Sequence, residues 1–286
     1  MSTPMSMPLA QFVSLIVRKS SPKLFYILRE RQVHLQSAKA NTSTRLEKWA
    51  QKRLMRMLCD KQKTSLDVGA HMGDYALEIM PFSGRLVLFE PIAELAVKLR
   101  DLGAGAPCAC SVEEVALSDH DGSAILKLPK GHKGSSSLEK ENTHVADLAS
   151  RVGIEERSIQ TRRLDSYNYN DIEFIKIDVE GHQLSLIEGA TETLDRCKPH
   201  LFMEIDNTHI PNAITTVSSK LNLLGYRGYY LISSVLFPIE NFREDLFHSA
   251  ENWKTGRLRI NDFFFFHKDR LQEVKDRCLS FTFNES

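Results

Sequence analysis

The chain has 286 residues, of which 42% are hydrophobic and 26% are charged, and its 37 basic and 37 acidic side chains cancel. This composition excludes an intrinsically disordered chain, because such chains combine few apolar residues with a high net charge. Length and composition together favour one large globular domain with an extension.

The cysteines do not fit a zinc finger. Five are present, an odd number, without a CxxC pair and without a histidine at zinc-finger spacing. This pattern favours reduced thiols and a cytoplasmic protein. The five are Cys59, Cys108, Cys110, Cys197 and Cys278.

The N-terminus is strongly basic. Residues 1–63 hold thirteen basic and three acidic side chains, a net charge of +10. We interpret residues 1–60 as a basic helical extension, whose last helix spans 44–60, and residues 61–286 as the main domain. The apolar run from Pro8 to Val17 is shorter than the ~20 residues that cross a bilayer. A solvated helix is the simplest interpretation, and contact with an anionic partner or a membrane surface is the alternative.

After residue 60, short apolar strands alternate with helices. The expected strands are 64–70, 84–90, 112–118, 172–179, 200–206, 229–236 and 258–267, and the expected helices between them are 74–80, 92–103, 183–195 and 212–224. Such alternation predicts an α/β fold with a mostly parallel sheet and helices on both faces. The run FFFF in the last strand is typical of a central strand that is buried on both faces. Residues 121–142, rich in Gly, Ser and Lys, are expected to form an irregular insertion.

In such a sheet, ligands bind outside the carboxyl ends of the strands. The segment LDVGAHMGDY places Gly69 and Gly73 in a turn that leaves room for a ligand to approach the backbone. Its GxxxG spacing differs from the GxGxxG of dinucleotide sites, which favours a cofactor without a pyrophosphate. Glu90 ends the second strand, where a carboxylate can accept hydrogen bonds from ribose hydroxyls. The alternatives are a plain glycine turn and, for Glu90, a cap on the following helix.

The segment FIKIDVEGHQ places charges in a strand that otherwise has the pattern of a buried one. Lys176 and Asp178 share one face of this strand, because side chains alternate with a period of two. Burying either charge alone is costly, so we expect an ion pair, a ligand contact or solvent access at the strand end. One interpretation is a buried ion pair that holds the loop. The other places Asp178 beside the reacting centre, with Glu180 and His182 on the following turn.

The next strand ends in two further acids, Glu204 and Asp206. Acids at neighbouring strand ends attract positive charge. We expect them to favour a cationic ligand, and the sequence assigns no metal site. Asp178 with Glu204 is the pair to test for a divalent ion, whose requirement stays open.

The chain resembles the FkbM family of S-adenosylmethionine-dependent O-methyltransferases, within the class I superfamily. The motifs that carry the resemblance are LDVGAHMGDYAL, LFEPIAELAVKL, EEVALSDHDGSAIL, GSSSL, RRLDSY, FIKIDVEGHQLSLIEGA and PHLFMEID, over residues 64–206. The resemblance implies a Rossmann-like fold with a seven-stranded sheet, and S-adenosylmethionine as cofactor. The cofactor-binding residues that it implies are Asp67, Gly69, Ala70, His71, Gly73, Asp74, Glu90, Pro91, Ala116, Leu117, Ser118 and Asp178.

The resemblance also implies methyl transfer to a hydroxyl of a sugar, glycan or polyketide-type acceptor. His182 is the leading candidate for the proton acceptor because imidazole titrates near neutrality. Glu180, Asp178 and Lys176 are the other expected catalytic residues. The alternatives are an NAD-dependent oxidoreductase, against which the missing GxGxxG argues, and a non-catalytic binding module. The expected partner is the small-molecule or glycan acceptor rather than a nucleic acid, and the oligomeric state is left open.

Overall fold

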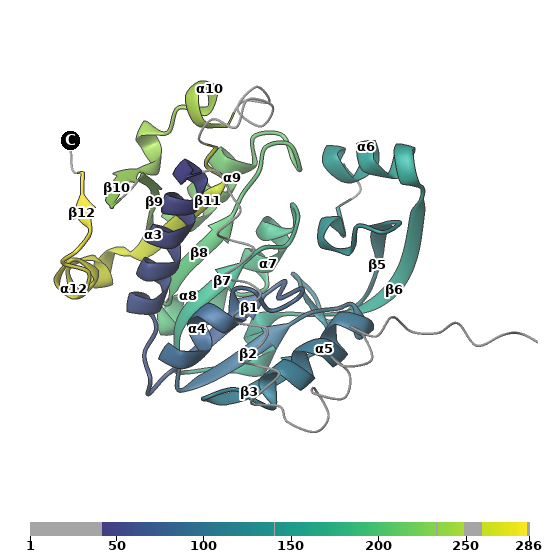
Figure 1. Cartoon of the computed structure of the whole chain (residues 1–286), viewed down its shortest axis with the longest axis horizontal. Helices are drawn as coiled ribbons and strands as arrows, with labels where there is room; N and C mark the ends of the chain where they lie inside the picture. The colour runs from purple at the N-terminus through teal and green to yellow at the C-terminus, as the bar shows by residue number, and fades with distance from the viewer. Residues whose placement is uncertain (1–41, 140, 233, 249–258, 285–286) are drawn as a thin grey trace, which may run out of the picture.

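The computed structural model describes residues 42–139, 141–232, 234–248 and 259–284, and the basic segment 1–41, with its apolar run, lies outside the described residues. A large sheet is the centre of the described part (Figure 1), in the order β12-β10-β9-β11-β8-β7-β1-β2-β3. Its strands are β1 (Thr64–Val68), β2 (Arg85–Phe89), β3 (Ala109–Glu113), β7 (Ile172–Ile177), β8 (His200–Glu204), β9 (Tyr226–Ile232), β10 (Val235–Pro238), β11 (Asp262–His267) and β12 (Thr282–Phe283).

The expected α/β fold with a mostly parallel sheet is confirmed. Strands β3, β2, β1, β7 and β8 are parallel, and β11 is antiparallel to both of its neighbours, β8 and β9. The expected number of seven strands is wrong, because the described sheet has nine. The interval 229–236, predicted as one strand, belongs to the antiparallel pair β9 and β10. Strand β12 has only two residues, so no alternating pattern of apolar and polar residues could have predicted it.

Helices cover both faces of the sheet (Figure 1). On one face lie α3 (Thr42–Leu58), α4 (Ala76–Ile79), α5 (Ala93–Gly103) and α12 (Leu271–Arg277), and on the other lie α7 (Gln183–Glu188), α8 (Thr191–Cys197) and α9 (Ala213–Leu223). The short helices are α10 (Glu244–Phe247) and the 3-10 helices Met80–Phe82, Lys133–Ser135, Leu164–Tyr167, Ile239–Asn241 and Lys268–Arg270.

Strand β11 joins the two apolar cores. Phe264 and Phe266 belong to the core on the α3 face, whereas Phe263 and Phe265 belong to the core on the α9 face. All four side chains are fully buried, which confirms the prediction of a central strand.

Helix α3 packs on the domain. Its residues Leu54, Met55 and Leu58 are 0% exposed and belong to the same core as β11. The division between extension and domain at residue 60 stays a prediction. Within the described residues, no helix combines the length and hydropathy that crossing a membrane requires.

The interval 109–162 differs most from expectation. The strand predicted at 112–118 is wrong, because β3 ends at Glu113 and the following residues join a second sheet. That sheet has the order β4 (Ala116–Leu117), β6 (Ile154–Arg162) and β5 (Gly122–Pro129), and α6 (Thr143–Val152) lies between β5 and β6 in the chain. The described part of residues 116–162, called the insertion from here on, therefore forms a small separate sheet. Apolar contacts of Leu126 and Leu128 with Ile92 and Leu95 hold it to α5.

The helix predicted at 183–195 is interrupted at Gly189. A Cβ on this glycine would lie 1.8 Å from the carbonyl oxygen of Ser118, so no other residue fits without movement of the backbone. The carbonyl of Gly189 also accepts a hydrogen bond from the amide of Asp165, 3.0 Å away. The break therefore brings the start of the insertion close to the end of α7.

Candidate active site

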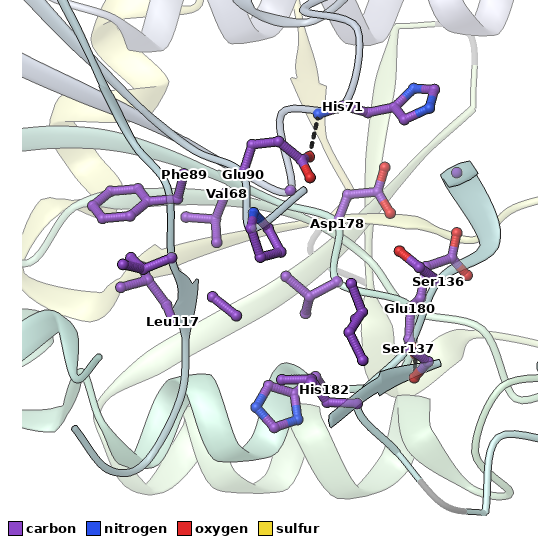
Figure 2. A pocket seen from close by; sticks show the side chains of 18 residues that line it. Val68, His71, Phe89, Glu90, Leu117, Ser136, Ser137, Asp178, Glu180 and His182 are labelled. Atoms are coloured by element: carbon purple, nitrogen blue, oxygen red, sulfur yellow. Dashed lines mark hydrogen bonds between the residues drawn. The ribbon is translucent and has the colours of Figure 1, made fainter. Parts of the chain in front are cut away.

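A pocket opens at the carboxyl ends of β1, β2 and β7, with the insertion as its opposite wall (Figure 2). It holds about 740 Å³ of empty volume, part of which is open to solvent. Its lining residues are Val68, Gly69, His71, Phe89, Glu90, Pro91, Val115, Ala116, Leu117, Leu126, Gly134, Ser136, Ser137, Leu138, Asp178, Val179, Glu180 and His182. Apolar walls with a few convergent polar groups are typical of a site for a small organic ligand.

The structure brings nine of the predicted site residues into this lining: Gly69, His71, Glu90, Pro91, Ala116, Leu117, Asp178, Glu180 and His182. The other predicted residues lie outside it: Asp67, Ala70, Gly73, Asp74, Ser118, Lys176 and Glu204. The rule that ligands bind at strand ends therefore located the pocket, although it did not separate lining from supporting residues.

The two glycines of the first turn have different surroundings. Gly69 has φ +72°, and a Cβ on it would lie 1.8 Å from the carbonyl oxygen of Asp178. Gly73 has φ +80°, and a Cβ on it would meet Leu102 of α5 at 2.6 Å. Both positions therefore require glycine, the first for close approach of two strand ends and the second for packing against a helix.

Glu90 connects the first turn to the start of α5. One carboxylate oxygen accepts a hydrogen bond from the amide of His71 (Figure 2), and the other accepts one from the amide of Ile92, both at 2.9 Å. Burial raises the pKa of Glu90 to about 7. The helix-capping alternative is thus present in the structure, and the carboxylate also lines the pocket, where a ribose contact stays a prediction.

Lys176 takes part in a buried ion pair behind the pocket wall. Its Nζ lies 3.2 Å from Asp67 and 3.5 Å from Asp178, and it donates a hydrogen bond to the carbonyl of Gly69 at 3.0 Å. Burial alone lowers the pKa of Lys176, but the two carboxylates raise it above its usual value. This position favours the interpretation of Lys176 as part of a buried ion pair that holds the loop. Asp178, in contrast, lines the pocket, and 27% of its side chain is exposed.

Glu180 lies on the turn after β7 with a left-handed backbone, φ +47°. Its Oε2 is 3.0 Å from Nε2 of His209, a residue that sequence reasoning missed, although the two atoms are not aligned for a hydrogen bond. Burial, followed by the charges of Asp178 and Asp206, raises the pKa of Glu180 to about 8. The side chain is therefore a carboxyl group that exchanges its proton near neutral pH.

His182 is held at both ring nitrogens. Its Nδ1 lies 2.6 Å from Oε1 of Glu139, and its Nε2 lies 3.0 Å from Oγ of Ser118. Ser118 is buried and also donates to Asp119 at 3.0 Å. Sequence reasoning missed Glu139, because nothing distinguishes it from the other charged residues of the insertion. To accept a proton from a substrate, His182 must give up one of these contacts.

Asp178 and Glu204, the pair named above as a possible site for a divalent ion, are not among the described groups that have metal-ligand spacing. Glu204 accepts a hydrogen bond from Asn261 at 2.6 Å, and burial raises its pKa well above the usual value. Among the described residues, one group has metal-ligand spacing: Glu173, His200 and Glu273. It lies at the amino ends of β7 and β8, and Glu173 already binds cationic side chains there, which disfavours a further cation.

Solved methyltransferases are similar to this chain at low identity. The FkbM methyltransferase from Methylobacillus flagellatus KT is 15% identical with a TM-score of 0.45, over 73% of this chain and 44% of that chain. The tRNA (m1A58) methyltransferase TrmI from Aquifex aeolicus is 11% identical with a TM-score of 0.34, over 76% and 66%. The plantazolicin methyltransferase BpumL, solved with SAH, is 11% identical with a TM-score of 0.30, over 91% and 96%. The chain thus spans less than half of the Methylobacillus protein.

Comparison of the sequence itself gives the family. No curated protein matches the sequence significantly. The family model described as the methyltransferase FkbM domain matches residues 67–228, which is more than half of the chain and includes the β1 turn, Glu90 and the turn after β7. The chain therefore belongs to the FkbM methyltransferase family.

Proposed function

We propose that the protein transfers the methyl group of S-adenosylmethionine to a hydroxyl oxygen of a sugar, glycan or polyketide-type acceptor. The observation that carries this proposal is the shared pocket, in which Glu90 and the Asp178 to Glu180 turn face the same space. Membership of the family supports methyl transfer, and the choice of a hydroxyl acceptor rests on the sequence resemblance.

The side chains in the pocket fit this cofactor chemically. Glu90 offers a carboxylate to ribose hydroxyls, and Asp178 offers one to an ammonium or sulfonium charge. The apolar side chains of Phe89, Leu117 and Leu126 suit a flat purine ring. When bound, the cofactor supplies an electrophilic methyl group.

The protein is expected to accelerate the reaction mainly by aligning the cofactor with the acceptor. Holding both reactants in line can supply ~7 to 11 kcal/mol of the barrier, and a positioned proton acceptor contributes a smaller factor of ~10² to 10⁴. We assign the proton acceptor to Glu180, because the residue lines the pocket and burial raises the pKa of its carboxyl group to about 8, near the working pH of a general base. His182, the first expectation, has both nitrogens in contact with other side chains.

A transfer assay with a labelled methyl group tests the proposal. Purified protein is incubated with labelled S-adenosylmethionine and fractionated glycan and small-molecule extracts, with Glu90→Ala as the control variant. We expect label in a methyl ether formed from a hydroxyl-bearing acceptor, and this ether is stable to mild base. Label in an amine contradicts the choice of a hydroxyl acceptor. Label in no fraction, together with no binding of S-adenosylhomocysteine in calorimetry, contradicts the proposal and leaves the binding module as the explanation.

A further inference from the structure

One wall of the pocket is a short strip of the insertion, residues 134–139, which we name the clasp segment. Gly134, Ser136, Ser137 and Leu138 line the pocket from this strip. Figure 2 shows Ser136 and Ser137 across the pocket from Phe89 and Leu117. At its start, a Cβ on Gly134 would lie 3.5 Å from the ring of His71, which follows β1. At its end, Glu139 contacts His182, which follows β7. The clasp segment therefore bridges two strand ends across the pocket.

Polar bonds fasten the clasp segment and its neighbour Asn142 to the turn after β7. The carbonyl of Glu180 accepts hydrogen bonds from Oγ of Ser137 at 2.6 Å and from Nδ2 of Asn142 at 2.7 Å. The contact between Glu139 and His182, at 2.6 Å, adds a carboxylate to this set. Hydrogen bonds to a charged group are roughly twice as strong as neutral ones, so the carboxylate contact is the strongest of the three.

The two sides of the insertion are anchored differently. On the α5 side, Leu126 and Leu128 pack on Ile92 and Leu95. On the α7 side, the anchors are the polar bonds of the clasp segment. Water replaces a polar bond at a net cost of only ~0.5 to 1.5 kcal/mol, whereas exposing a buried leucine costs ~1.5 to 3 kcal/mol. The α7 side of the insertion is therefore held by polar bonds that water can replace, whereas the α5 side is held by apolar packing.

The contacts of His182 suit a residue that keeps the clasp segment in place. Nδ1 of His182 lies 2.6 Å from the carboxylate of Glu139, and Nε2 lies 3.0 Å from Oγ of Ser118, so both ring nitrogens are in contact with other side chains. The imidazole thus connects the clasp segment to Ser118, the residue that follows β4. His182 lines the pocket in this fixed orientation.

We propose that the Glu139–His182 contact is a clasp that retains the bound cofactor and sets the rate at which it exchanges. Glu139 and His182 are positioning residues: they hold the pocket wall in place and take no part in the methyl transfer itself. The inference rests on the proposed function, because it takes the pocket as the cofactor site. Release of the product cofactor requires the clasp segment to leave the turn after β7.

The first test measures the dissociation rate of S-adenosylhomocysteine by stopped-flow displacement. We expect Glu139→Ala to raise this rate about tenfold, and Glu139→Gln, which keeps a neutral hydrogen bond, to raise it less. Glu141→Gln is the matched control, because Glu141 is an exposed acid two residues further along the chain. An unchanged dissociation rate for Glu139→Ala overturns the proposal.

The second test does not need the cofactor. The amide of Ser137 donates to the carbonyl of Lys127, and that of Glu139 donates to Oγ of Ser137, both at 3.1 Å, so hydrogen exchange at these amides reports on the clasp segment. In Glu139→Ala we expect faster exchange there and unchanged exchange in β7 and β8. Unchanged exchange in the clasp segment, or faster exchange throughout with a lower melting temperature, overturns the proposal. If the wild type binds no S-adenosylhomocysteine, the proposed function fails, while the exchange data still decide whether the clasp exists.

Discussion

Asp67 and Lys176 face each other across the paired strands β1 and β7, with 3.2 Å between carboxylate and ammonium and at most 3% of either side chain exposed. Lys176→Met leaves the carboxylate of Asp67 buried without its counter-charge, so we expect the free energy of unfolding to fall by ~3 to 5 kcal/mol. Urea denaturation measures this loss. The double variant Asp67→Asn with Lys176→Met should be more stable than Lys176→Met alone, and a single variant within ~1 kcal/mol of the wild type contradicts the prediction.

Glu173 should make the free energy of unfolding depend on pH in the acid range. It accepts hydrogen bonds from Arg270 at 2.8 Å, Arg277 at 2.9 Å and Lys63 at 3.0 Å. Burial raises its pKa, but the interactions with Arg270 and Lys63 outweigh burial and lower the pKa from 4.5 to about 2. Because the folded-state pKa is depressed, the stabilisation is complete above pH 4.5 and is lost as pH falls toward 2.

The corresponding experiment compares Glu173→Gln with the wild type. The variant should be less stable at pH 7 by up to ~3 kcal/mol, and the difference should shrink at pH 3. Urea unfolding at the two pH values measures it. A difference that is the same at both pH values shows that the cations do not depress the pKa of this carboxyl.

Cofactor binding should strengthen as pH rises through the pKa of Glu90. Burial places that pKa near 7, and ribose hydroxyls donate to the ionised carboxylate, so binding favours the form that predominates above pH 7. Calorimetry with S-adenosylhomocysteine at pH 6 and pH 8.5 measures the effect. Glu90→Gln should bind ~1.5 to 3 kcal/mol more weakly and lose most of the pH dependence. A wild-type affinity that does not change with pH removes Glu90 from the ribose site.

Glu180 and His182 should affect different kinetic constants. Glu180→Gln should lower the rate constant at saturating cofactor by ~10² or more, because it removes the proton acceptor. The wild-type rate should rise as pH passes about 8, where Glu180 ionises. His182→Ala should instead raise the KM for the cofactor with a small effect on kcat. A loss of ~10² in kcat for His182→Ala, shrinking at high pH, assigns the proton acceptor to His182 instead.

The sequence predicted those parts of the site that lie at strand ends. Gly69, Glu90 and Asp178 each follow a buried apolar run, and parallel strands bring such positions to one edge, so their convergence follows from the pattern alone. Local pattern also predicted β11, because FFFF fits a strand buried on both faces.

Contacts between distant segments were not predictable in this way. Glu139 and His182 are 43 residues apart, and their pairing depends on how the insertion folds back over the pocket. Strand β6 carries mostly charged and polar side chains, which gives no apolar alternation to detect. Gly73 was expected at the cofactor, but its position against Leu102 depends on the packing of α5.

The position of β11 has a consequence for synthesis of the chain. This strand is inserted between β8 and β9, both of which precede it in sequence, and it supplies two phenylalanines to each core. On the ribosome, β8 and β9 emerge with an open slot between them and with both apolar layers unfilled. We therefore expect the nascent domain to expose apolar surface until residue 267 has left the exit tunnel.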